Sequence, residues 1–194
     1  MTDERADLPF PLSGTTLVVG PSNVGKTRLT ARALDAWVGS RGAEGVVVLD
    51  FAPEFERDGR VLGGRLTRFG PLPEGVRASV LDTHAPRAEG ETEAESVRLA
   101  GENADRARAI VEDLLDRPRA VFVNDATIPF QHERGTPEWL TDYCDRAEAA
   151  VLNAFESDEL GTEDFVSRHE REVLGTLRAW ADRVVRLDDD GDEG

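Results

Sequence analysis

The chain has 194 residues, of which 39 are acidic and 23 are basic, so its formal net charge is -16. This charge argues against non-specific binding to DNA or to anionic membranes, because both repel an acidic surface. No apolar run approaches the ~18–20 residues of a membrane-spanning helix, and the first residues lack the basic and apolar regions of a signal peptide. We therefore expect a cytoplasmic protein with no membrane partner.

Lys26 is the only lysine, and arginine supplies all the other basic residues. An acidic excess with so little lysine resembles proteins of salt-rich cytoplasms, where screening relieves self-repulsion. We expect a halophilic protein, and an acidic protein adapted to ordinary salt is the alternative. Cys144 is the only cysteine, so no disulfide can form within the chain, and we expect it to fill the core in a reducing cytosol.

The first element predicted along the chain is a strand over 16–19, which follows a polar lead-in at 1–13. It runs into GPSNVGKT, an octet that fits the pattern G-x-x-x-x-G-K-[ST] of a phosphate-binding loop, the Walker A motif. Gly20 and Gly25 let the backbone turn so that its N–H groups point at a β-phosphate. Lys26 places an ammonium against the β- and γ-phosphates, and Thr27 offers a hydroxyl to Mg²⁺.

This motif and its context resemble the P-loop NTPase superfamily. An apolar run precedes the motif, a helical pattern follows it, and the positive N-terminal end of that helix would face the same phosphates. The resemblance implies that a nucleotide with Mg²⁺ is bound by the loop and the residue after it: Gly20, Pro21, Ser22, Asn23, Val24, Gly25, Lys26, Thr27 and Arg28.

The rest of the chain alternates between helical and strand patterns. Residues 51–77 have little periodicity and predict a loop with short helical turns. Helices are predicted where apolar residues step by three and four, over 29–38, 94–116, 136–155 and 166–180. Short apolar runs predict further strands at 46–49, 79–81, 120–123 and 184–187.

Strands alternating with helices predict an α/β fold, a three-layer αβα sandwich with a mostly parallel sheet of about five strands. We expect one P-loop NTPase domain over 1–187, and a disordered acidic tail at 188–194, where the sequence cannot bury anything. In such a sheet the ligand site lies beyond the carboxyl ends of the strands, where the loop already is.

Three predicted strands are followed by an aspartate, and P-loop enzymes need one such acid, the Walker B residue, to hold Mg²⁺. Asp125 follows the apolar run AVFVN and is the first choice, whereas Asp82 in SVLDTHAP is the second. For each residue alone, a helix cap or a satisfied carboxylate at a strand end is the ordinary structural explanation.

Hydrolysis also needs a group that orients or deprotonates the attacking water. Most ATPases of the additional-strand class carry a glutamate directly after the Walker B aspartate, but here Ala126 stands there. Asp50 or Glu54 is the predicted substitute, because the order of elements resembles that of RecA and KaiC-like ATPases, whose catalytic glutamate comes from a different strand. The resemblance is one of layout, and it favours ATP hydrolysis.

A small-molecule kinase and a nucleotide-dependent switch with little turnover are the alternatives. Adenylate-kinase-like and shikimate-kinase-like proteins carry a lid arginine, for which Arg134, Arg168 and Arg171 are candidates, although a solvated helix face explains the last two better. In a kinase Asp50 would grip the acceptor hydroxyl, and 62–70 could bind the substrate or the base. The missing N-K-x-D motif of GTPases favours ATP. These alternatives would bring a partner besides the nucleotide, either a small-molecule acceptor or a protein.

Overall fold

The computed structural model describes residues 8–57, 60–62 and 64–188. Its main sheet has six strands, all parallel, in the order β5-β2-β6-β7-β1-β8. These strands are β1 (Gly14–Gly20), β2 (Val46–Asp50), β5 (Arg77–Val80), β6 (Ala120–Asn124), β7 (Ala149–Phe155) and β8 (Arg183–Arg186). A small antiparallel hairpin pairs β3 (Phe55–Arg57) with β4 (Arg60–Leu62).

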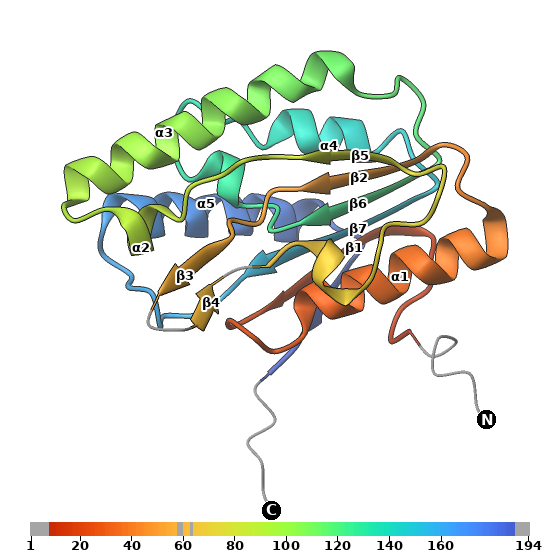
Figure 1. Cartoon of the computed structure of the whole chain (residues 1–194), viewed down its shortest axis with the longest axis horizontal. Coiled ribbons are helices and arrows are strands. Elements are labelled where there is room, and N and C mark those ends of the chain that lie inside the picture. Colours follow the sequence, from red (N-terminus) through yellow and green to blue (C-terminus); the bar gives the residue numbers. More distant parts are fainter. Residues whose placement is uncertain (1–7, 58–59, 63, 189–194) are drawn as a thin grey trace, which may run out of the picture.

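Helices cover both faces of this sheet, so the described chain has three layers (Figure 1). One face packs against α1 (Lys26–Arg41) and the 3-10 turn η1 (Leu66–Phe69). The other face packs against α3 (Glu93–Ile110), α4 (Glu138–Cys144) and α5 (Phe165–Trp180). The remaining short turns are α2 (Pro86–Glu89), η2 (Val111–Asp113) and η3 (Ile128–Phe130).

Alternation along β1 shows why both faces are apolar. Leu17 and Val19 point into the core beneath α3, α4 and α5, whereas Val18 points into the core beneath α1. All three side chains are fully buried, as expected for a central strand of a parallel sheet. The predicted α/β class with a parallel sheet is therefore confirmed, with six strands in place of about five.

The helix predicted over 136–155 is wrong in its second half. The helix α4 ends at Cys144, and Ala149–Phe155 is the strand β7, which lies between β6 and β1. Six of its seven residues are buried, because helices cover it from both sides. An apolar run of this length fits either a buried strand or a helix, and here the position within the sheet decides.

Other boundaries differ by a few residues. The strand predicted at 79–81 is the edge strand β5, and α3 ends at Ile110 before the turn η2. The hairpin of β3 and β4 was not predicted within the loop 51–77. Of the predicted acidic tail, 189–194 lies outside the described residues, as do residues 1–7 of the lead-in. No helix in the described part of the chain is long and apolar enough to cross a membrane.

Candidate functional site

The octet at 20–27 forms the turn between β1 and α1. Asn23 and Gly25 both adopt positive φ angles, 63° and 96°, which glycine and asparagine tolerate better than other residues. A Cβ on Gly20 would lie 2.2 Å from the carbonyl oxygen of Leu187, so the chain after β8 packs directly on this glycine. The helix α1 begins at Lys26 with no acidic residue in its first turn and no side-chain hydrogen bond from its N-cap residue Gly25, so the helix's own residues do not neutralise its positive end.

Lys26 is held at the start of this helix, largely out of water. Its ammonium donates to the carbonyl oxygen of Pro21 and lies 5.9 Å from the centre of the Phe155 ring. Burial lowers the pKa of Lys26, while the negative charges of Asp125, Glu159 and Glu170 oppose that shift. The lysine is therefore a cation placed among carboxylates beside the loop.

A cavity of about 530 Å³ opens over the loop. Six of the nine residues predicted to bind nucleotide line it: Ser22, Asn23, Gly25, Lys26, Thr27 and Arg28. Gly20, Pro21 and Val24 belong to the loop but do not line the cavity. The Ser22 N–H donates to the carboxylate of Glu159 at 2.8 Å, so a protein side chain holds one amide of the loop.

Asp125 lines the same cavity from the end of β6. Its backbone has a φ of 54°, and its N–H donates to Asn153 Oδ1 at 3.0 Å. Burial raises the pKa of Asp125 to about 6; Lys26 acts to lower it, and the charges of Asp50 and Glu170 add to the rise. The structure thus brings together Thr27, Lys26 and Asp125, a hydroxyl, an ammonium and a carboxylate.

Asp50 and Glu54 lie away from this cavity. The Asp50 carboxylate is buried and accepts hydrogen bonds from Asn124 Nδ2 at 2.8 Å, Leu66 N at 2.8 Å and Ala52 N at 3.2 Å. Burial raises the pKa of Asp50, and these hydrogen bonds oppose the rise. Glu54 is exposed and lies 3.6 Å from Arg65. Neither residue lines the cavity over the loop.

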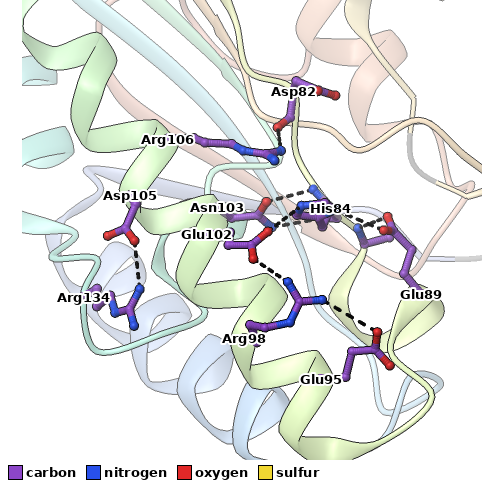
Figure 2. Close-up of polar contacts among 11 residues, drawn as sticks. Asp82, His84, Glu89, Glu95, Arg98, Glu102, Asn103, Asp105, Arg106 and Arg134 are labelled. Carbon is purple, nitrogen blue, oxygen red and sulfur yellow. Dashed lines mark hydrogen bonds and ion pairs between the residues drawn. The ribbon is translucent and has the colours of Figure 1, made fainter.

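Asp82, the second choice for the metal, belongs to a different set of polar contacts. Its side chain is exposed, and its carbonyl oxygen accepts a hydrogen bond from Arg106 on α3 (Figure 2). Nearby, His84 lies between Glu89 and Glu102, with its two ring nitrogens 3.1 and 3.0 Å from their carboxylates. This network joins α2 to α3, and Asp82 does not line the cavity over the loop.

A buried polar network, which the sequence did not predict, joins the loop to Asp125. Asn153 in the middle of β7 donates through Nδ2 to Thr30 Oγ1 and to Asn124 Oδ1, each at 2.9 Å. Thr30 Oγ1 in turn donates to the carbonyl oxygen of Lys26 at 3.1 Å. Because Asn153 Oδ1 also accepts from Asp125 N–H, one side chain ties the first turn of α1 to the metal candidate.

A second group of cavity residues was also missed. The Glu170 carboxylate is buried and accepts from Thr127 Oγ1 at 2.8 Å and from Gln131 Nε2 at 2.9 Å, and it lies 2.6 Å from NH1 of Arg87. Gln131 Oε1 is buried and has no hydrogen-bond partner in the part of the chain described. One feature of the sequence could have revealed Glu170. It is an acidic residue on the apolar face of α5, which it shares with Val166, Val173 and Leu177.

The arginines that a kinase lid would use lie at the surface. Arg134 pairs with Asp105 at 2.8 Å, and Arg168 donates to the carbonyl oxygen of Glu163. Arg171 pairs with Asp158 and lines a second cavity of about 460 Å³, which adjoins the first. None of the three lines the cavity over the loop, and for Arg168 and Arg171 this agrees with the solvated helix face expected above.

A scan of protein-family models and a search of curated proteins give no match for this chain.

Proposed function

We propose that the protein is a Mg²⁺-dependent P-loop ATPase, which binds ATP over the loop at 20–27 and transfers the γ-phosphoryl group to water. One observation carries the proposal: Lys26, Thr27 and Asp125 line a single cavity at the carboxyl ends of β1 and β6. These are the residue types that a P-loop enzyme uses for its phosphates and its metal.

Each residue has a separate role in the proposal. The loop amides and the start of α1 bind the β- and γ-phosphates, and the Lys26 ammonium neutralises part of their charge. Thr27 and Asp125 offer hard oxygen ligands, the kind that Mg²⁺ requires, and the nucleotide phosphates and water complete its shell. When bound, the ion draws negative charge from the reacting phosphate. No group of three histidine, cysteine or acidic side chains within the described residues is arranged to hold a metal.

The strand order also favours this class. The strand β7 lies between β1, which leads into the loop, and β6, which leads to Asp125. An inserted strand at this place is in keeping with the additional-strand class, to which RecA and KaiC-like ATPases belong. The acid expected after Asp125 is replaced by the buried Ala126, so a different group must act on the attacking water.

Transfer to a small acceptor is the second candidate. The cavity extends past the loop to Gly64 and Phe69, and Phe69 is half exposed. This extension leaves room for an acceptor beside the phosphates. A switch with little turnover would use the same nucleotide contacts.

Titration of Mg-ATP by calorimetry in molar KCl tests binding. We expect wild type and the control Thr176→Ala, an exposed threonine on α5, to bind alike. Lys26→Ala and Thr27→Ala should each weaken binding by tenfold or more, because each removes a contact to phosphate or metal. Equal affinity in wild type and both loop variants would refute the proposal.

Phosphate release without any acceptor separates the candidates. A rate well above spontaneous hydrolysis supports the ATPase. Tight binding with a rate at the spontaneous level would favour the kinase or the switch.

A further inference from the structure

Arg87 lines the cavity, and its guanidinium is largely out of water. Its side chain is 14% exposed, and it lines both the cavity over the loop and the adjoining one. The group is fixed by Glu170 Oε2 at 2.6 Å and Ser167 Oγ at 3.2 Å. Both contacts use NH1, so the NH2 and Nε donors are not committed to them.

Arg87 and Lys26 both lie near the ring of Phe155. The Cζ atom of Arg87 lies 5.5 Å from the ring centre, and Nζ of Lys26 lies 5.9 Å from the same centre. Both cations therefore line the cavity and lie near the same ring. Lys26 is expected at the β- and γ-phosphates, so Arg87 is a second cation that a terminal phosphoryl group in this cavity could meet.

Glu170 holds Arg87 in place. Thr127 and Gln131 donate to its Oε1, which leaves Oε2 for the guanidinium. Because both oxygens of this buried carboxylate are held by neighbouring donors, it is suited to fixing the direction of the arginine.

We propose that Arg87 is a catalytic residue of this site, supplied by the same chain, which binds the oxygens of the γ-phosphoryl group as it is transferred. The inference rests on the proposed function. Water forms a new O–P bond while the bond from phosphorus to the β–γ bridging oxygen breaks, and its electron pair leaves with ADP. One hydrogen of the water stays on the released phosphate and the other leaves as a proton. A guanidinium stabilises the charge spread over the phosphoryl oxygens during this step. Glu170 is its positioning residue.

The test compares Arg87→Gln with Arg178→Gln, an arginine of the adjoining cavity that pairs with Glu156 at 2.9 Å. Because Arg87→Gln leaves Glu170 buried without its cation, the double variant Arg87→Gln/Glu170→Gln is measured beside it. For each we measure thermal unfolding, affinity for Mg-ADP with and without aluminium fluoride, and phosphate release, all in molar KCl.

We expect both Arg87 variants to bind Mg-ADP within about threefold of wild type, but to lose the affinity gained with aluminium fluoride and about 10²-fold or more in kcat. Arg178→Gln should change neither quantity. Glu170→Gln alone should lower kcat less than Arg87→Gln, because the guanidinium remains. A purely structural Arg87 would instead lower the melting temperature of Arg87→Gln and leave aluminium fluoride binding and kcat of the folded double variant at wild-type values, which overturns the inference. If wild type binds neither Mg-ATP nor Mg-ADP, it is the proposed function that fails.

Discussion

Asp125→Asn should stabilise the ligand-free protein at neutral pH, even though it removes the proposed metal ligand. Asp125 is half-buried in the wall of the cavity, and this burial raises the pKa of its carboxyl from an ordinary 3.8 to about 6. In the unfolded chain it loses its proton near pH 4. Between those two values the folded state binds more protons than the unfolded state, so stability falls as the pH rises.

The size of the effect follows from the two pKa values. At about 1.4 kcal/mol for each pKa unit, ionising Asp125 in the folded state costs about 3 kcal/mol above pH 6. The attraction of Lys26 is already part of that pKa. An asparagine fits the same place, because the residue has a φ of 54°, which asparagine adopts readily.

Urea unfolding in molar KCl, without nucleotide or Mg²⁺, measures the difference between about pH 4 and pH 8. We expect Asp125→Asn to match wild type near pH 4 and to exceed it by about 2–3 kcal/mol above pH 7. The control Asp82→Asn, at an exposed site, should stay within about 0.5 kcal/mol of wild type at every pH. A variant that is less stable than wild type at pH 7, or a difference that does not vary with pH, would show that the carboxylate is not buried at a cost.

Three further results are expected. Glu159→Gln should raise the affinity for Mg-ATP severalfold in calorimetry, because the Glu159 carboxylate accepts from the Ser22 N–H at 2.8 Å and attracts the Lys26 ammonium, so it competes with phosphate for both. The control Asp158→Asn should leave the affinity unchanged. If the affinity of Glu159→Gln is also unchanged, nucleotide does not compete for this amide. Asn153→Leu should lower the free energy of unfolding, measured with urea, by about 2–3 kcal/mol, because it removes the hydrogen bonds of Asn153 to Thr30, Asn124 and Asp125. An unchanged free energy of unfolding would show that these hydrogen bonds do not stabilise the fold. The melting temperature should rise with KCl up to molar concentrations, and one indifferent to salt would count against halophilic adaptation.

The loop and its neighbouring strand could be predicted because the signal is local. Eight consecutive residues carry the motif, and the glycines and the lysine within it fix both the turn and the cation. The buried runs at 46–49 and 120–123 were equally clear, since each is apolar throughout and is followed by a polar residue. In these stretches local preference and final environment agree.

The strand β7 could not be predicted in the same way. Its sequence AAVLNAF contains three alanines and a leucine, which favour a helix, and it follows a true helix. Pairing with β1 and β6 places it inside the sheet, with Leu152 opposite Leu17 and Val123, and the helices on both sides bury its two faces. Contacts between residues far apart in the sequence override local preference here.

The place of Asp50 depended on strand order, which the sequence does not give. An aspartate at the end of any parallel strand lies at the ligand edge, but β6 and β7 separate β2 from β1. Asp50 therefore meets Asn124 and the η1 turn, and its carboxylate serves their N–H groups. Aspartates at strand ends look alike in the sequence, and only the order of the strands in the sheet decides which of them lies beside the loop.

Burial shifts the pKa values of Asp125 and Lys26 in opposite directions. It raises the pKa of Asp125 and lowers that of Lys26, so each is driven toward its neutral form in the absence of ligand. A bound divalent cation would favour the ionised carboxylate, and a bound polyphosphate would favour the charged ammonium. The same desolvation that destabilises the ligand-free site would strengthen the contacts with a magnesium nucleotide that we propose, because charges interact more strongly where water is excluded. A site of this kind is costly to keep charged when no ligand is bound, and that cost is the physical reason to expect binding and folding stability to be linked.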